Sequence, residues 1–570
     1  MKSAIIRLIT IGLLVMELQL QTVNGQAYCN PVSLNYRSSL QPSEQTEVSD
    51  PSVVLYKDDY YLFASNAEGY WHSKDLLHWK LIQTIDLPQE NDAPTAVVID
   101  GWVYYFTSLS NKIYRSNDPA NGKWELYNSN FLLSMISDFC VFADTDNRVY
   151  CYYACSNNDG LMARELDVKN KLNPKGVPTN CLLKNTTGQG WKRPSDKSKK
   201  ISTPGVSGSW VNKYNGKYYY QFTEPDTEFN TSNEVVYVSD RPFGPFTYAA
   251  HNPFVSKPKG FVSTAGKGCT FADKHGNWWH IATLTAPDKV KTGLRIGLFP
   301  ASFDAEGNLV TYTDFGDYPI IIPNYKYNHV NELRPGWSLL SFYKPAETSS
   351  SKSVNPVDFA FDENMGTFWS AQHTNKKEWL SVDLGSLCTI NAVQLSFAEN
   401  NAKRPAQPDT CTYQYLMQYS ADKKTWKILI DETTSTADHP HPFEVMSAPV
   451  QARYVKITSY CMPGGNFAIS GFRVFGTASC FQPTIVKSFQ ALKDRRDPRK
   501  IKLTWYGQQK NVTGYNIRYG TQKDKLYQCY QVYNNSPVVF HGLDKNKTYY
   551  FEIDAFGENG VSPSLIHSSH

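Results

Sequence analysis

The chain has 570 residues, with 57 Lys and Arg against 53 Asp and Glu, so its formal net charge of +4 is small for its length. A nucleic-acid-binding protein would need a concentrated basic surface, which this balance does not favour, and 570 residues are too many for one domain. Aromatic residues make up 14% of the chain, and short strand-like runs alternate with turn residues. These features predict an all-β protein of three or four domains.

The first 25 residues have the layout of a secretory signal peptide. Lys2 and Arg7 precede an apolar run over 8–15, and small residues follow at 23–25. The run is too short to span a bilayer, and no other stretch approaches twenty apolar residues. We therefore expect an exported protein, either secreted, periplasmic or at the cell surface, without a membrane span.

The eleven cysteines are scattered along the chain. Cys151 and Cys155 form the only closely spaced pair, and no second pair or His cluster follows to complete a metal site. Buried free thiols with an occasional disulfide are therefore the expected state of these cysteines.

A repeat sets the expected fold of the first half of the chain. Each copy joins a β-branched or aromatic strand, a polar turn and a strand rich in Tyr or Trp; the copies are 50–63, 93–106, 138–152, 208–220 and 268–281. Asp100-Gly101 and Asn215-Gly216 suit type I′ hairpin turns, whose central residues need positive φ. With two outer strands per copy, the repeat predicts a five-bladed β-propeller over residues 30–340.

The residues that open the five repeats should converge on one mouth of the central channel. They are Asp50, Asp92, Asp138, Ser207 and Lys267. Three carboxylates aimed at one pocket indicate a catalytic centre, whereas the alternative is that each aspartate only caps a turn before its strand.

Residues 30–324 resemble glycoside hydrolase family 43, on the order of these motifs. The resemblance implies an inverting mechanism in which Asp50 is the catalytic base and Asp138 orients the general acid and tunes its pKa. The segment 203–219 resembles the one that carries the acid, but Ser207 stands where the family has a glutamate. Lys267 stands where the family often has a histidine, and its ammonium predicts that no divalent ion is bound at the centre.

Another residue must therefore supply the acid if hydrolysis occurs. Glu228 is the best candidate because it follows the second strand of the fourth repeat, and Glu224 is a weaker one. The alternative for Glu228 is a solvated or sugar-binding carboxylate. Tyr70, Trp71 and Trp210 are expected to stack on sugar rings near the mouth, with packing between blades as their alternative. Asp92, Ser207 and Lys267 are expected to contact the substrate as well.

Two β-sandwiches are expected after the propeller. Residues 347–477 closely resemble the discoidin, or factor 5/8 type C, domain, a jelly roll shared with carbohydrate-binding module family 32. Its expected core residues are Trp369, Trp379, Leu384 and Trp426, and its candidate ligand contacts are His373, Asn400, Arg404 and Phe467. The resemblance also implies a structural Ca²⁺, for which Asp362 is a candidate ligand. Residues 480–565 resemble a fibronectin type III domain, with Tyr549 as a structural residue.

The first functional hypothesis is a secreted, monomeric glycoside hydrolase without a catalytic cofactor. It would act on side chains of plant or algal polysaccharides, as a xylosidase, arabinofuranosidase or galactosidase does, beside a glycan-binding module. The second hypothesis is an inactive, glycan-binding propeller, because Ser207 replaces the expected acid. The third is an adhesion protein, because both appended folds also serve contacts without carbohydrate.

Overall fold

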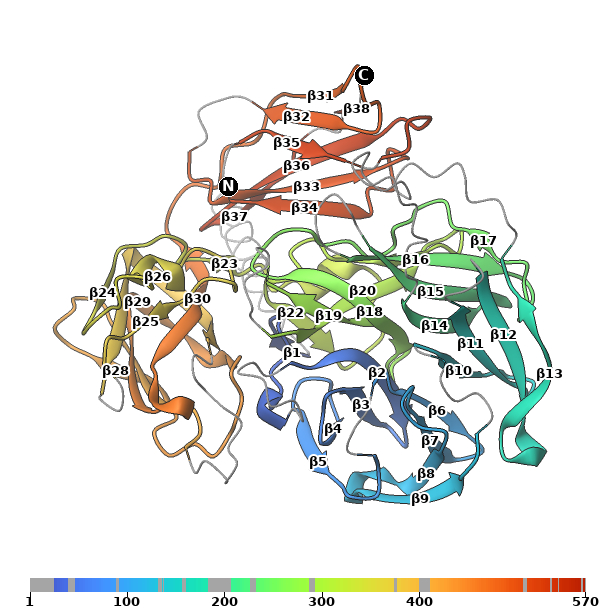
Figure 1. Ribbon diagram of the computed structural model, residues 1–570. Coiled ribbons are helices and arrows are strands. Elements are labelled where there is room, and N and C mark those ends of the chain that lie inside the picture. The colour runs from blue at the N-terminus through green and yellow to red at the C-terminus, as the bar shows by residue number, and fades with distance from the viewer. Residues whose placement is uncertain are drawn as a thin grey trace, which may run out of the picture.

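The fold was established from a computed structural model of the chain (Figure 1). It describes residues 25–38, 47–88, 92–131, 136, 138–155, 160–182, 207–225, 232–286, 293–373, 377–398, 411–505, 510–533, 536–541, 543–564, 567 and 568. The described part is all-β, and its helical segments are single 3₁₀ turns: Tyr36–Ser38, Pro119–Asn121, Val168–Asn170, Val330–Leu333, Val357–Ala360 and Pro463–Gly465. The predicted signal peptide lies almost entirely outside these residues, among which no helix is long and apolar enough to cross a membrane.

Five four-stranded antiparallel sheets, here called blades I to V, follow one another along the chain. Blade I has β2 (Ser49–Tyr56), β3 (Asp59–Ser65), β4 (Gly69–Ser73) and β5 (Lys80–Gln83), and blade II has β6 (Thr95–Ile99), β7 (Trp102–Phe106), β8 (Ile113–Asp118) and β9 (Lys123–Asn128). Blade III has β10 (Cys140–Ala143), β11 (Val149–Cys155), β12 (Gly160–Asp167) and β13 (Asn173–Asn180). Blade IV has β14 (Ser207–Tyr214), β15 (Lys217–Pro225), β16 (Ser232–Ser239) and β17 (Thr247–Tyr248), and blade V has β18 (Ser263–Ala272), β19 (Trp278–Thr285), β20 (Arg295–Phe303) and β21 (Leu309–Thr311). This order is consistent with the predicted five-bladed propeller.

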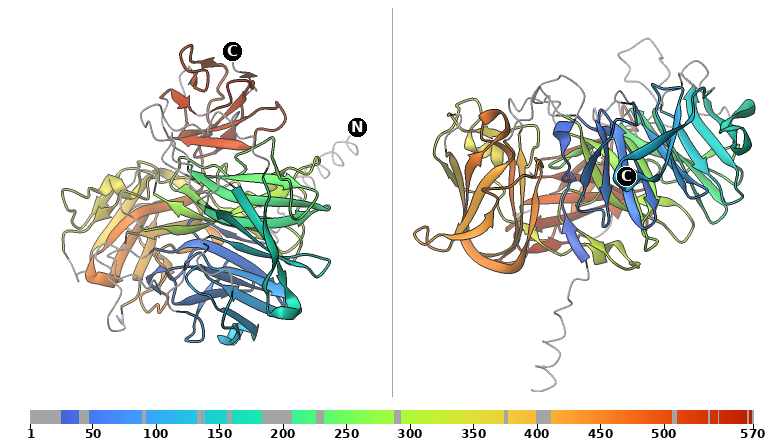
Figure 2. Two further views of the ribbon diagram at one scale, coloured as in Figure 1. Left: turned by 45° about the vertical axis from the view of Figure 1, so that its right-hand side comes forward. Right: turned by 90° about the horizontal axis from the view of Figure 1, so that it is seen from below.

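Each blade packs against the next through its own apolar layer. Separate hydrophobic clusters join blades I and II, II and III, III and IV, and IV and V, and a further cluster joins V to I. The alternating pattern of the strands supplies an apolar side chain to each face, so every blade buries both faces against its neighbours. The result is a closed ring, visible in Figures 1 and 2, that removes most sheet edges.

The two ends of the ring are joined by a short sheet. The strand β1 (Gly25–Tyr28) pairs antiparallel with β22 (Ile320–Pro323), so the chain start lies against the segment that leaves blade V. Nearby, the buried Asn30 side chain donates to the carbonyl oxygens of Leu298 and Gly316 at 2.8 and 2.7 Å. These contacts hold the entry and exit of the propeller together.

The first sandwich is an eight-stranded sheet that folds around one core. Its strands are β23 (Ser338–Leu339), β24 (Ala346–Thr348), β25 (Trp369–Ser370), β26 (Trp379–Phe397), β27 (Gln414–Ser420), β28 (Lys427–Asp431), β29 (Phe443–Cys461) and β30 (Ala468–Ala478). The register of the long strands β26 and β29 shifts twice, which lets them bend round the core. A disulfide joins Cys411 to Cys461, and the other cysteine side chains that the structure describes are free thiols, as expected.

The expected core of this sandwich is correct in part. Trp369 and Leu384 are fully buried in the cluster. Trp379 is only half-buried, and Trp426 lies outside the cluster, with the Lys456 ammonium 4.4 Å from its ring centroid. Trp426 is also half-buried, and it lies beside this ammonium rather than in the core because it follows a polar turn rather than a strand.

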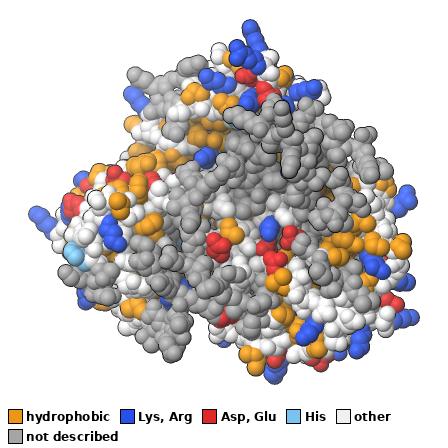
Figure 3. Space-filling view, in the orientation of Figure 1, with side chains coloured by type: hydrophobic (Ala, Val, Ile, Leu, Met, Phe, Trp, Pro, Cys, Tyr) orange, Lys and Arg blue, Asp and Glu red, His pale blue; other side chains and the backbone are white. Residues whose placement is uncertain are grey.

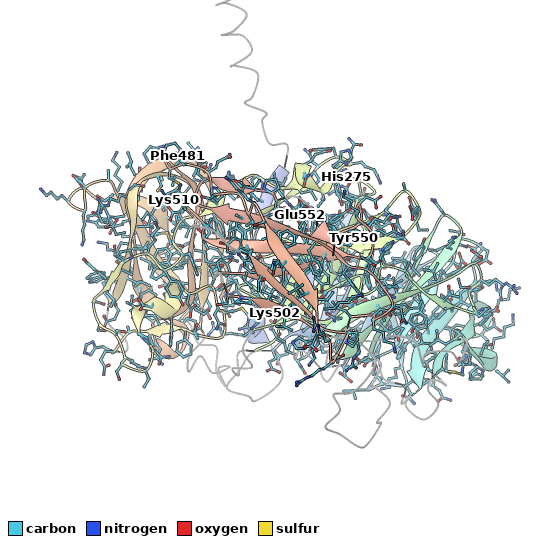
Figure 4. The ribbon with its side chains drawn as sticks, turned by 90° about the horizontal axis from the view of Figure 1, so that it is seen from above. His275, Phe481, Lys502, Lys510, Tyr550 and Glu552 are labelled. Carbon is cyan, nitrogen blue, oxygen red and sulfur yellow. A yellow bond between two sulfur atoms is a disulfide. The ribbon has the colours of Figure 1, made fainter. Side chains whose placement is uncertain are left out.

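The second sandwich has two sheets. One contains β31 (Phe489–Lys493), β32 (Ile501–Trp505) and β35 (Val538–Phe540). The other contains β34 (Gln528–Val532), β33 (Gly514–Gly520), β36 (Tyr550–Gly557), β37 (Gly560–Ser562) and β38 (His567–Ser568). Figure 4 looks down on this unit and labels Lys502 and Tyr550, from one sheet each. The Tyr549 hydroxyl accepts a hydrogen bond from the Asp544 N–H at 3.0 Å, a structural contact.

The three units meet around a buried ion pair. Arg473 of the first sandwich donates two hydrogen bonds of 2.8 Å to the carboxylate of Glu363 and one of 2.8 Å to Gln394 Oε1. Tyr533 of the second sandwich donates to the same Glu363 carboxylate at 3.0 Å. On the propeller side, the Arg473 guanidinium lies 4.6 Å from the centroid of the Phe261 ring. One buried cation is thus shared by all three units.

Candidate functional site

Five residues at or near the inner strands of the blades have the left-handed backbone conformation: Asp50 (φ 52°), Ala93 (φ 42°), Asp138 (φ 54°), Gly208 (φ 69°) and Lys267 (φ 56°). Strand pairing aligns the blades in the same way, because the residue directly before each of Asp50, Gly208 and Lys267 pairs with the second strand of its blade. These pairs are Ser49 with Ser65, Ser207 with Thr223 and Gly266 with Thr283. Asp50, Asp138 and Lys267 are therefore equivalent positions, as expected. Asp92 and Ser207 lie one residue earlier in their blades, so their side chains start from a different backbone position.

Asp50 is held by contacts from two blades. The hydroxyls of Ser49 and Ser65 donate to its Oδ2 at 2.6 and 2.8 Å, and its backbone N–H donates to Thr283 Oγ1 at 3.1 Å. The side chain of Ser65 also accepts a hydrogen bond from the Ala93 N–H of blade II. Only 7% of Asp50 is exposed. The carboxylate is therefore fixed in place and accessible over a small area.

Lys267 supplies the positive charge of the site. Its Nζ lies 2.9 Å from Asp50 Oδ1, and its backbone N–H donates to Thr223 Oγ1 at 2.5 Å. Burial by itself lowers the pKa of Lys267, but the charges of Asp50, Asp138 and Asp92 outweigh burial and raise it. The ammonium stays charged at neutral pH and occupies the side of Asp50 opposite the serine hydroxyls.

The structure brings three carboxylates and this ammonium within electrostatic reach of one another. Burial raises the pKa of Asp138, and the negative charges of Asp50 and Asp92 add to the increase, while Lys267 opposes it. Burial also raises the pKa of Asp92, again with Asp50 adding to the effect. Figure 3 shows acidic and basic side chains beside one another near the middle of the propeller face. The predicted convergence at one mouth is thus present for these four residues.

Close backbone contacts shape the mouth beside Lys267. A Cβ atom added to Gly208 would lie 2.7 Å from the Lys267 Cα, which no side chain can do without displacing it. The residue before it, Ser207, is half-buried, and its backbone pairs with Thr223. The sequence signal for this packing is a glycine at the position where the other four blades have a residue with a Cβ atom.

A chain of buried polar groups lies behind Lys267 and was not anticipated. Glu234 is fully buried; its Oε1 accepts from the Gly268 N–H at 2.8 Å and lies 3.3 Å from His280 Nε2. His280 Nδ1 in turn contacts Thr270 Oγ1 at 2.9 Å. The sequence feature that could have predicted this buried group is a glutamate directly before the apolar pair Val235-Val236. The chain fixes the backbone that carries Lys267.

The three aromatic residues expected at the mouth pack inside the propeller instead. Tyr70 and Trp71 are fully buried, and the Tyr70 hydroxyl donates to the Pro119 carbonyl oxygen at 2.6 Å. Trp210 packs against apolar clusters on both sides of blade IV, and its Nε1 donates to the Thr270 carbonyl oxygen at 2.8 Å. The prediction of sugar stacking was wrong for Tyr70 and Trp71, because β4 lies inside its blade; for Trp210 the packing alternative holds.

Several candidates cannot be placed. Glu228 lies outside the described residues, as do Asn400 and Arg404, and the structure describes the backbone of Glu224 but not its side chain. Of the two remaining ligand candidates in the first sandwich, Phe467 is buried in the core, so it cannot contact a ligand. His373 is half-exposed and pairs with Glu378 at 2.8 Å.

Asp362 lies in a turn of the first sandwich. Its Oδ1 accepts from the Asn364 N–H at 3.1 Å and its Oδ2 from the Thr367 hydroxyl at 2.5 Å, while burial raises its pKa to about 7. A calcium ion takes six to eight oxygen ligands. The turn offers one carboxylate whose two oxygens are already engaged, and the described residues contain no group of three or more His, Cys, Asp or Glu side chains that could hold a metal. Backbone carbonyl oxygens can supply the other ligands of a calcium ion, so the calcium site at Asp362 stays a prediction.

Comparison with known proteins identifies two regions. Residues 40–308 match the family model of glycosyl hydrolases family 43, and residues 345–466 match that of the F5/8 type C domain. A non-reducing end alpha-L-arabinofuranosidase of Bacteroides ovatus is 25% identical over 309 residues, which cover 48% of this chain and 54% of that protein. A beta-xylosidase of Xylanibacter ruminicola is 27% identical over 223 residues, covering 34% and 60%. The chain thus matches little more than half the length of these relatives.

Among solved structures, Bacteroides ovatus xyloglucan PUL GH43B aligns with a TM-score of 0.42 at 18% identity, covering 79% of this chain and 98% of its own.

Proposed function

We propose that this protein is an inverting glycosidase that removes pentose side chains from arabinoxylan-type plant polysaccharides, because residues 40–308 match the family model of glycosyl hydrolases family 43. The names of the relatives, an arabinofuranosidase and a xylosidase, support the sugar class. The observation that carries the proposal is the meeting of Asp50, Asp92, Asp138 and Lys267 at the strand openings of four blades.

Asp50 is proposed as the general base. Its Oδ2 accepts from Ser49 and Ser65, and Lys267 holds its Oδ1, so the carboxylate is oriented before substrate arrives. A water molecule beside it would lose its proton to the carboxylate while attacking the anomeric carbon. Inversion requires a second carboxyl group roughly 6.5–9.5 Å away, on the far side of the glycosidic bond, to protonate the leaving oxygen.

We propose Glu228 for that acid and Asp138 for the group that orients it. Asp138 suits the role because it is partly buried and its own pKa is raised, so it forms strong hydrogen bonds without carrying the reaction itself. Ser207 cannot replace the acid, because a hydroxyl does not protonate a leaving sugar near neutral pH. Glu228 follows β15, the strand paired with the one that Ser207 opens.

The test uses purified full-length protein, aryl pentosides and arabinoxylan. Asp50→Asn should lower kcat by about 10²–10⁴-fold, the usual contribution of a general base, whereas Asp58→Asn, an exposed aspartate of the same blade, should leave kcat unchanged. Glu228→Gln should be rescued by azide on an activated aryl substrate. NMR of the first product should show the inverted anomer. Full activity in Asp50→Asn would refute the assignment.

A second candidate function is glycan binding without hydrolysis. The ion pair of 2.9 Å between Lys267 and Asp50 favours it, because the ammonium compensates the charge that a base needs. This candidate predicts no turnover of any aryl pentoside but measurable binding of xylo- or arabino-oligosaccharides to the wild type. Loss of that binding in Asp50→Asn, with no turnover in the wild type, would favour it over the enzyme.

The appended units are proposed to assist at the substrate. The first sandwich, of F5/8 type C, would bind glycan, and the second would be a fibronectin type III spacer, which its division into a three-stranded and a larger sheet supports. We further propose that the protein is exported and acts as a monomer.

A further inference from the structure

A cavity of about 520 Å³ lies away from the propeller mouth, between the end of the propeller and the second sandwich. Three parts of the chain line it: the exit of blade V around 312–320, the connecting segment 330–338, and the strands β33, β36 and β37 with residues 524–529, which lead into and begin β34. Among the described residues assigned to the catalytic site, Asp50, Asp138 and Lys267 do not line it. Its volume is in the range of pockets that bind small ligands.

The polar side of this cavity contains a carboxylate with a free oxygen. Asp554 is 5% exposed; its Oδ2 accepts from Arg518 Nε at 3.0 Å, while its Oδ1 accepts no hydrogen bond from any described residue. The second arm of Arg518 donates to Glu552 at 2.9 Å. Glu552, labelled in Figure 4, is on the same strand but does not line the cavity. A buried acceptor without a donor is costly unless a bound molecule supplies one.

The other walls are aromatic or carry compensated charge. Tyr312, Trp337 and Tyr527 line the cavity and are half-buried, so parts of their rings are exposed. A second ion pair joins Arg334 to Asp314. Both cations of the lining therefore have carboxylate partners.

From this lining we infer that the cavity is a binding site for a neutral saccharide of one or two units. An anion would find each guanidinium already paired, and a purely apolar ligand would leave Asp554 Oδ1 without a donor. A sugar offers hydroxyl donors for Asp554 and Asp314 and an apolar ring face for Tyr312, Trp337 and Tyr527. Such a site on the same chain would raise the local concentration of glycan near the propeller.

The inference does not depend on hydrolysis, so it is tested in the full-length Asp50→Asn protein. In this variant the saccharide used as a probe should not be hydrolysed during the measurement. Titration calorimetry with D-xylose, L-arabinose and xylobiose measures binding at each site. Asp554→Asn should weaken one site about tenfold or more, because an amide keeps the shape but weakens a charge-assisted hydrogen bond. Trp337→Ala, which removes an apolar wall instead, should weaken the same site. Crystals soaked in xylobiose should show the sugar in this cavity.

Glu552→Gln is the matched control, because it breaks the other contact of Arg518 without touching the cavity, and it should leave affinity unchanged. Thermal melting of each variant shows that it is folded. The inference is overturned if no saccharide binds beyond the propeller mouth, if Asp554→Asn and Trp337→Ala both bind as the parent does, or if Glu552→Gln weakens binding as much as they do. A propeller that proves inactive would leave the inference standing.

Discussion

The ion pair at the junction of the three units should be essential to stability. The side chains of Arg473 and Glu363 are 1% and 3% exposed, and two hydrogen bonds of 2.8 Å join them. Glu363→Gln would leave the guanidinium buried with a neutral partner. Removing one member of such a buried pair costs about 3–5 kcal/mol, because the remaining charge can neither pair nor reach water.

A second ion pair in the same sandwich gives the control. Arg453 donates to Asp383 through two bonds of 2.7 and 2.8 Å, the same geometry, but the two side chains are 41% and 26% exposed. Asp383→Asn should therefore cost at most about 1 kcal/mol. Replacing Arg473 by Met together with Glu363→Gln should recover much of the loss, because no buried charge then remains.

Urea unfolding monitored by circular dichroism and tryptophan fluorescence measures these differences. A chain with three units need not unfold in one step, so the midpoint of the first transition is compared among variants. Hydrogen exchange at the Tyr533 side of the junction should increase in Glu363→Gln. The reasoning is refuted if Glu363→Gln and Asp383→Asn shift the midpoint equally, or if the double variant is less stable than Glu363→Gln.

Three further predictions concern the catalytic face and the disulfide. Lys267→Met removes the positive charge that lowers the pKa of Asp138, so the pKa of Asp138 should rise further. The acidic limb of the plot of kcat/KM against pH should therefore move to higher pH. An unmoved limb would contradict the proposed electrostatic coupling between Lys267 and Asp138. Gly208→Ala should push Lys267 away from its partner and cost about 10²-fold in kcat/KM, while Gly216→Ala, equally left-handed but with no atom within 4 Å of the added methyl, should not affect activity. Cys411→Ser opens a disulfide whose two cysteines are 50 residues apart, and it should destabilise the first sandwich by up to about 4 kcal/mol in the chain-entropy treatment. Urea unfolding measures this difference. A change below about 1 kcal/mol would show that the loop is already constrained without the disulfide.

The sequence alone was enough for features that depend on neighbouring residues. Asp100-Gly101 and Asn215-Gly216 predict tight hairpins, and the structure has φ of 47°, 77°, 48° and 80° at these four residues, where the strands β6 and β7, and β14 and β15, meet. The spacing of the repeats likewise predicted the inner strands of all five blades. Turn conformation and strand pattern are local properties, so they can be read without knowing what the strands pack against.

The tertiary structure decided which side chains face the mouth and which face a neighbour. From the sequence, Trp71 could stack on a sugar, but in the structure it packs against blade V. A strand rich in aromatic residues has the same sequence pattern whether its side chains pack in the interior or contact a ligand. The pairing of Asp50 with Lys267 joins residues more than two hundred positions apart, and no local rule specifies it. Asp554, with a buried oxygen that accepts no hydrogen bond from the described residues, lines a cavity only because a second sandwich rests against the propeller. Contacts of this kind depend on ring closure and on the docking of separate units, which a linear pattern does not encode.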